Sequence, residues 1–200
     1  SLSYITKWMC EKFSIEIKIM PVTDNTIETR IITDKGDMHL QEFWVKHRGL
    51  DEVKGIEYQG AEKVRPNPDA MNAIHDSNLI VIAPGNPLTS IGPMLAIKGI
   101  RKELAKKKTK VVAISPIIGN SAISGPTGKY MEAAGIEVSA LGVAKMYADV
   151  CSNIIIDTKD RMLTKKIESL NINVHDTKIR MTTKQSEDAL AASIIKQFYH

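Results

Sequence analysis

The sequence predicts an α/β fold: a Rossmann-like, mostly parallel sheet flanked by helices, with a small β-rich hairpin segment at about residues 15–65. The first observation is that three short runs are apolar at almost every position, as strands buried on both faces require. These runs are residues 78–83, 110–115 and 153–157. The second is that helical patterns separate them, which favours parallel, adjacent strands joined by right-handed crossovers.

The β-rich segment follows a short predicted helix. Residues 4–13 carry Ile5, Trp8, Met9 and Phe13 at helical spacing, which indicates an amphipathic helix. The apolar period then changes to that of strands, with a turn at residues 34–37. The strands that this pattern predicts are residues 15–20, 27–33, 38–45 and 53–59.

From residue 66 onward, helices alternate with the three apolar runs. A short helix ends near His75, and a longer one over residues 91–107 has a break around Gly99. A fourth, shorter strand is predicted at residues 171–175. The remaining predicted helices are residues 127–134, 140–148, 159–169 and 184–199.

Composition predicts one globular domain over residues 1–200. Of the 200 residues, 43% are apolar and 25% are charged, which excludes a disordered class. The net charge of +4 and the 5% aromatic content do not favour nucleic-acid binding. No apolar run is long enough to span a membrane. Two cysteines far apart, Cys10 and Cys151, do not suggest a disulfide framework, so we expect a reducing cytoplasm.

Three loops follow the predicted parallel strands, where doubly wound sheets bind ligands. The first contains Gly85 and Asn86, then Thr89 and Ser90, whose hydroxyls either cap the next helix or contact an anionic ligand. The second is long and rich in small residues, and it carries Asn120 and Lys129 as candidate ligand contacts. In the third, a carboxylate of residues 157–160 is expected to cap a helix.

Several common signatures are absent from the sequence. It has no G-x-x-x-x-G-K-[ST] loop and no G-x-G-x-x-G after a strand, which argues against a P-loop nucleotide site and a nicotinamide dehydrogenase. No G-x-S-x-G elbow marks a hydrolase. The histidines have no metal-ligand spacing; they are His39, His47, His75, His175 and His200.

Two of these loops resemble those of 2-phospho-L-lactate transferases. Residues 84–93 read P-G-N-P-L-T-S-I-G-P, similar to the family's G-P-S-N-P-x-[ST]-S-I-x-P loop. Residues 111–129 resemble its S-P-I-[IV]-G-x-x-x-[VI]-x-G-P-x-x-K segment. Residues 36–48, with an H-x-Q-[ED]-[FYW]-W-V core, and residues 135–139 also match, as do Asp157 and Asp160 in V-x-D-x-x-D.

The resemblance implies a reaction and a cofactor. A 2-phospholactyl or phosphoenolpyruvyl group would pass from a lactyl- or enolpyruvyl-diphosphoguanosine donor to the deazaflavin alcohol Fo, releasing GMP, in coenzyme F-420 biosynthesis. Mg²⁺ would assist, with ligands mostly outside this chain, because the family's N-terminal glycine-rich strand–loop has no match here. The catalytic groups would lie there too, and a homodimer is possible. The substrate-binding residues would be Gly85, Asn86, Pro87, Thr89, Ser90, Gly119, Asn120 and Lys129.

Two alternatives remain open. One is a non-catalytic regulator of the same superfamily that binds a nucleotide sugar, whose first loop carries serine, leucine and an aromatic residue where this chain has Asn86, Pro87 and Leu88. The other is an inactive fragment. The loop residues favour the transferase.

Overall fold

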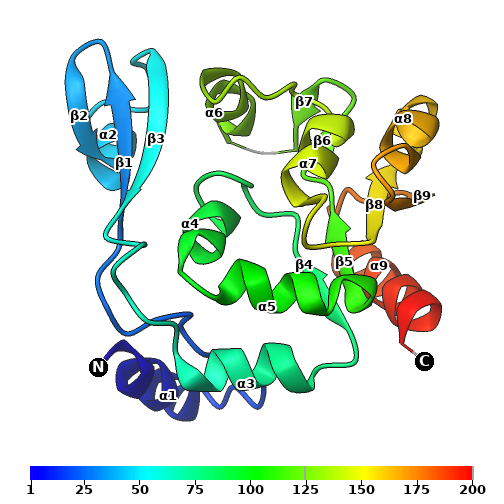
Figure 1. Cartoon of the computed structure of the whole chain (residues 1–200), viewed down its shortest axis with the longest axis horizontal. Coiled ribbons are helices and arrows are strands. Elements are labelled where there is room, and N and C mark those ends of the chain that lie inside the picture. The colour runs from blue at the N-terminus through cyan, green and yellow to red at the C-terminus, as the bar shows by residue number, and fades with distance from the viewer. Residues whose placement is uncertain (124, 200) are drawn as a thin grey trace.

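A four-stranded parallel sheet is the largest sheet of the computed structural model, which describes residues 1–123 and 125–199. Its order is β4-β5-β8-β9 (Figure 1). The predicted parallel arrangement of the three apolar runs is therefore confirmed, and the fourth strand joins them in the same direction. The strands are β4 (Ile80–Ile82), β5 (Val111–Ile114), β8 (Asn153–Asp157) and β9 (Asn173–Thr177).

The two faces of this sheet bury different apolar clusters. Val112, Ile114 and Ile155 point to one face, where they pack with Leu190 and Ile194 of the C-terminal helix α9 (Lys184–Phe198). The opposite face belongs to the larger core, to which the other helices contribute except the N-terminal one. Both faces are thus covered over β5 and β8, as expected for strands that are apolar at every position.

Strand β4 departs from that expectation. It lies at an edge of the sheet, and the side chain of Val81 is 41% exposed. The prediction that the whole run 78–83 is buried on both faces is therefore wrong at Val81. Val81 is exposed because the apolar cluster around α9 reaches the neighbouring Val112 but does not extend to the edge strand.

The helices between the strands match the predicted ones closely, except that the first part of the helix predicted over residues 159–169 is a 3-10 turn. The long helix is broken as expected, because Gly99 takes a φ of 102°, which favours glycine. A two-stranded hairpin, β6 (Ile117–Ile118) and β7 (Ser121–Ala122), follows β5. The helices are α3 (Pro68–Asp76), α4 (Ile91–Ala96), α5 (Ile100–Lys106), α6 (Thr127–Ala133), α7 (Ala140–Tyr147) and α8 (Thr164–Glu168), with 3-10 turns η1 (Lys108–Lys110) and η2 (Thr158–Leu163).

A separate antiparallel sheet stands beside the parallel one (Figure 1). Its order is β2-β1-β3, from β1 (Glu28–Thr33), β2 (Gly36–His39) and β3 (Val53–Gln59). Helix α6 packs against β3, which joins the antiparallel sheet to the rest of the molecule. The predicted hairpin segment is thus confirmed, and we call β1, β2, β3 and the intervening α2 (Leu40–Val45) the hairpin unit.

Within the hairpin unit, the strand predicted over residues 38–45 is wrong beyond His39. Strand β2 ends at His39, and residues 40–45 form helix α2. His39 begins the helix because its Nδ1 accepts a hydrogen bond from the Gln41 amide at 3.1 Å. Glu42 and Lys46 form an i,i+4 ion pair along it, and only Phe43 is buried. A short apolar run fits either element, and here the local cap decides.

The N-terminal segment also differs from its prediction. Helix α1 (Leu2–Lys12) forms, but its apolar side chains, including Trp8 and Phe13, are exposed and none is buried. The strand predicted over residues 15–20 is wrong, since those residues pair with no described strand. In the described part of the chain, no helix is long and apolar enough to cross a membrane.

Candidate functional site

A cavity of about 440 Å³ opens where the loops after β4 and β5 meet. Its size is that of a small-molecule pocket, and its position beyond the carboxyl ends of parallel strands is where such sheets bind ligands. We call it the first cavity. It is lined by Trp44, Pro84, Gly85, Asn86, Thr89, Ser90, Pro116, Ile123, Gly125, Pro126, Thr127, Tyr130, Ile179 and Met181.

The loop after β4 is held by Asn86. Its side-chain Oδ1 accepts hydrogen bonds from the amides of Leu88 at 2.9 Å and Thr89 at 3.1 Å. Its backbone carbonyl accepts from the amides of Ser90 and Ile91, both at 3.0 Å. Ser90 begins helix α4 but makes no side-chain cap. Capping therefore does not occupy the hydroxyl of Ser90, a residue that lines the first cavity beside Thr89.

Strand β3 fixes the same loop from its other side. The Tyr58 hydroxyl donates a hydrogen bond of 2.6 Å to the Leu88 carbonyl, and burial raises the pKa of Tyr58 to about 12. Gly92 makes room for this contact, because a Cβ there would overlap the Tyr58 hydroxyl. Pro87 lines this side, away from the first cavity. The hairpin unit thus sets the position of the loop after β4.

Two aromatic side chains from different elements meet the first cavity. Trp44 of α2 is 42% exposed. Tyr130 of α6 is 1% exposed, and its ring lies 6.1 Å from that of Phe43 between centroids. The Tyr130 hydroxyl has no hydrogen-bond partner among residues 1–123 and 125–199, and burial raises its pKa to about 12. The hydroxyl stays protonated at neutral pH, but its oxygen is itself buried.

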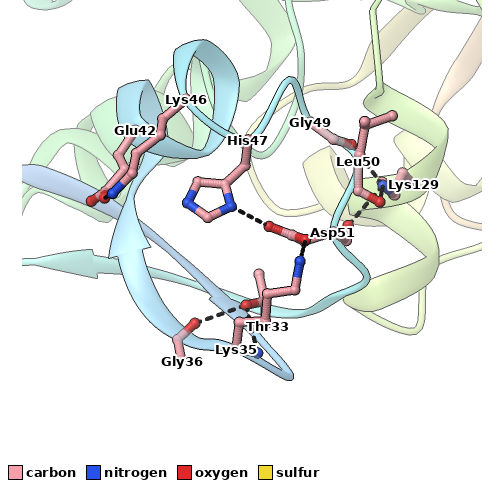
Figure 2. Close-up of polar contacts among 10 residues, drawn as sticks. All are labelled: Thr33, Lys35, Gly36, Glu42, Lys46, His47, Gly49, Leu50, Asp51 and Lys129. Carbon is pink, nitrogen blue, oxygen red and sulfur yellow. Dashed lines mark hydrogen bonds and ion pairs between the residues drawn. The ribbon is translucent and has the colours of Figure 1, made fainter.

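Lys129 ties α6 to the hairpin unit (Figure 2). Its ammonium donates hydrogen bonds to the carbonyls of Gly49 at 2.7 Å, Leu50 at 3.2 Å and Asp51 at 2.8 Å. It also lies 5.8 Å from the centre of the Phe43 ring. All three protons of the ammonium are thereby used within the protein. Lys129 holds the 49–51 loop and does not line the first cavity.

The 49–51 loop in turn positions Trp44. Gly49 has a φ of +65°, and a Cβ there would lie 2.5 Å from Cζ3 of Trp44. The indole therefore packs directly on the Gly49 backbone. A chain of contacts consequently runs from Lys129 through Gly49 to Trp44 at the cavity wall.

Asp51 anchors the other end of this loop (Figure 2). Its largely buried carboxylate pairs with the Lys35 ammonium, and Nδ1 of His47 lies 2.6 Å from its Oδ2. The hydrogen bond from Lys35 is the main reason that the pKa of Asp51 lies below its usual value. The carboxylate is thus charged at neutral pH and stabilises the loop.

The carboxylates after β8 accept hydrogen bonds from backbone amides. Asp157 Oδ1 accepts from the Lys159 amide at 3.1 Å, which confirms the predicted helix cap. Asp160 is 3% exposed and accepts from the Gly119 amide at 2.9 and 3.1 Å through its two oxygens. Burial raises the pKa of Asp160.

By themselves these two carboxylates do not make up a site for the magnesium ion that the resemblance implies. In the described part of the chain, no three His, Cys, Asp or Glu side chains group closely enough to hold a metal ion. We therefore derive no step through a metal, and magnesium stays a prediction.

The structure brings together only part of the predicted site. Gly85, Asn86, Thr89 and Ser90 line the first cavity, whereas Pro87, Gly119, Asn120 and Lys129 do not. The second loop does reach the cavity, but through Pro116, Ile123 and residues 125–127. Substrate contact by any of these residues stays a prediction. Sequence reasoning missed Trp44, Tyr130, Ile179 and Met181; only the motif around Trp44 carried a signal for its position.

The fold and the site together define a class: a Rossmann-like α/β protein with a ligand-sized cavity at the carboxyl edge of its parallel sheet. The 2-phospho-L-lactate transferase CofD family matches residues 1–195. The chain belongs to that family, which confirms the resemblance seen in its loops.

Two relatives show how far the similarity extends. The 2-phospho-L-lactate transferase of Methanosarcina mazei is 39% identical over 198 residues, which cover 99% of this chain and 65% of the relative. That of Methanocaldococcus jannaschii is 41% identical over 186 residues, covering 91% of this chain and 58% of the relative. The chain thus spans less than two thirds of the length of these relatives.

Solved structures with a similar fold include protein BH3568 from Bacillus halodurans. One of its structures superposes with a TM-score of 0.65 and 13% identity, covering 96% of this chain and 66% of that one. A second, described as a member of the upf0052 family, gives a TM-score of 0.66 and 15% identity, covering 94% and 66%. At this identity the likeness supports the fold, and the α/β class predicted from the sequence is confirmed.

Proposed function

We propose that this chain carries the substrate pocket of a 2-phospho-L-lactate transferase. The reaction would move the 2-phospholactyl, or phosphoenolpyruvyl, group from a diphosphoguanosine donor to the deazaflavin alcohol Fo in coenzyme F-420 biosynthesis. The hydroxyl of Fo would attack the phosphorus attached to the lactyl group and lose its proton. The bond from that phosphorus to GMP would break, and GMP would leave with the bonding electron pair.

One observation carries the proposal: family-matching residues of two loops line a single cavity at the carboxyl edge of the sheet. In the part of the chain that the structure describes, no hydrogen bond engages the hydroxyls of Thr89 and Ser90, so both can donate to a phosphate oxygen. Gly85 leaves the loop backbone open to close approach.

The side chains divide the cavity into two kinds of contact. Thr89, Ser90 and the amide of Asn86 would meet the phosphate end of the donor. Trp44 offers an aromatic face against which a planar ring can pack. Lys129 would act indirectly, by holding the 49–51 loop on which Trp44 packs.

The assay uses a full-length version of the protein, with the N-terminal strand–loop region that the resemblance implies, and mixes it with Mg²⁺, Fo and the lactyl-diphosphoguanosine donor. We expect GMP and the phospholactyl-deazaflavin to form in equal amounts, measured by chromatography and mass spectrometry. Ser90→Ala should weaken donor binding about tenfold or more, since one hydrogen bond to a charged group contributes about 1.5–3 kcal/mol. Ser169→Ala, on the exposed end of α8, is the matched control.

Binding of a uridine nucleotide sugar without GMP release from the donor would contradict the transferase proposal and favour the regulator. Small-molecule substrates are the only partners that the proposal requires. A homodimer and a cytoplasmic location stay predictions; sedimentation of the purified chain would test the first.

A further inference from the structure

A second cavity, of about 400 Å³, adjoins the first and has a different chemistry. It lies beyond the carboxyl ends of β8 and β9, and Ile123 lines both cavities. We call it the basic cavity because three of its side chains are cationic. Its lining residues are Ile118, Ser121, Ala122, Ile123, Asp157, Thr158, Lys159, Lys178, Arg180 and Thr182.

Successive side chains of the segment after β9 line the two cavities alternately. Ile179 and Met181 line the first cavity, whereas Lys178, Arg180 and Thr182 line the basic cavity. An extended segment sends successive side chains to opposite sides, so one short stretch supplies an apolar wall to one cavity and a cationic wall to the other. Ile179 is fully buried, which fixes the segment in this orientation.

The charges in the basic cavity are not balanced within the protein. In residues 1–123 and 125–199, none of Lys159, Lys178 and Arg180 forms a side-chain ion pair, whereas nearby Arg161 pairs with Asp176 at 2.6 Å. The one carboxylate in the lining, Asp157, is 5% exposed.

The Asp157 carboxylate accepts hydrogen bonds from the protein backbone. It accepts hydrogen bonds from the amides of Lys159 at 3.1 Å and Ile179 at 3.3 Å. Three cations therefore face one carboxylate, which leaves a formal excess of two positive charges in the lining, and the cavity attracts anions.

We propose that the basic cavity binds a phosphate or diphosphate group. A guanidinium presents a planar fork of donors that matches phosphate oxygens, and two ammonium groups supply point charges beside it. The hydroxyls of Ser121 and Thr158 lie in the same lining and can donate to further oxygens. This assignment goes beyond the proposed function and does not require the transferase activity.

The anion has two possible sources with the same chemistry. It is either part of the phosphate chain of a nucleotide that also reaches the adjoining first cavity, or a free anion bound independently. Both require the same cationic side chains. The two sources predict different results when those side chains are neutralised. If the anion belongs to a nucleotide, the protein loses affinity for the nucleotide as well as for inorganic pyrophosphate. If it is a free anion, the protein loses affinity for pyrophosphate alone.

Calorimetric titration of the chain with inorganic pyrophosphate, and separately with GDP, tests the assignment. Neutralising the wall with Lys178→Gln and Arg180→Gln together should weaken pyrophosphate binding at least tenfold. The double variant Lys165→Gln and Lys166→Gln is the matched control, because it removes the same charge from exposed positions of α8. Both double variants change exposed side chains. Unfolding midpoints equal to that of the unmodified chain would confirm that both variants fold.

A parallel loss of GDP affinity would assign the cavity to the nucleotide's diphosphate, and unchanged GDP affinity would assign it to a free anion. No pyrophosphate binding by the unmodified chain, or equal weakening in both double variants, would overturn the proposal. Absence of GMP release in the transferase assay would leave these titrations unaffected, so the two failures are distinguishable.

Discussion

Replacing Lys129 by methionine tests the contact chain behind Trp44. Methionine keeps an unbranched apolar stem near Phe43 and removes the ammonium that donates to three carbonyls of the 49–51 loop. A hydrogen bond from a charged group contributes about 1.5–3 kcal/mol. The three do not add fully, because Leu50 is 77% exposed and the freed carbonyls there can turn to water.

We therefore expect Lys129→Met to lower the free energy of unfolding by about 2–3 kcal/mol. For a chain of 200 residues this corresponds to a fall of about 4–12 °C in Tm. Chemical denaturation measures the first quantity and a thermal scan the second. Lys145→Met is the control, since Lys145 is an exposed lysine of α7, and a surface change of this kind costs less than about 0.5 kcal/mol.

The same variant should loosen Trp44. With Trp8→Phe as background, Trp44 is the one remaining tryptophan of the two in the chain. Its fluorescence should then be quenched by acrylamide more strongly in Lys129→Met than in Lys145→Met. Equal quenching, together with unfolding free energies within about 0.5 kcal/mol of each other, would refute the contact chain.

Three further changes test the neighbouring contacts. Gly49→Ala should cost about 1–3 kcal/mol of unfolding free energy, because alanine at φ +65° is strained and its Cβ meets the indole; an unchanged denaturation midpoint would contradict this. Tyr58→Phe should cost about 1 kcal/mol by losing the bond to the loop carbonyl, whereas Tyr4→Phe on exposed α1 should cost almost nothing in the same denaturation experiment. Asp51 contributes stability at neutral pH because the hydrogen bond from Lys35 lowers its pKa. That contribution should be lost as the pH falls below the usual carboxyl value of 3.8 and through the lowered pKa. The free energy of unfolding in acid should therefore depend on pH more weakly in Asp51→Asn, and an equal pH dependence in the two proteins would disprove this role of Asp51.

The sequence predicted the parallel sheet well because its signal is local. Each of β4, β5 and β8 is a short apolar run between helical patterns, and burial on two faces leaves few alternatives for such a run. The prediction was wrong at residues 40–45, where helix and strand patterns overlap and a His39 cap decided the outcome. It was also wrong over residues 15–20, whose alternation suits a strand but which pair with no strand in the described part of the chain.

The candidate site was predictable only where a loop directly follows a strand. Gly85, Asn86, Thr89 and Ser90 could be placed at the carboxyl end of β4 from sequence order alone. The contact between Lys129 and the 49–51 loop joins residues about 80 positions apart, so no local pattern reveals it. The alternation of residues 178–182 between two cavities could not be inferred either, because it depends on where the second loop folds.

The most direct test of the central claim is to locate a bound substrate by amide NMR. The chain is titrated with the lactyl-diphosphoguanosine donor while the backbone amide resonances are followed. We predict that the amides of Gly85, Thr89, Ser90 and Thr127 shift together and saturate at one donor concentration. Saturable binding that leaves all four amides unmoved would contradict the account, because the ligand would then lie outside the first cavity.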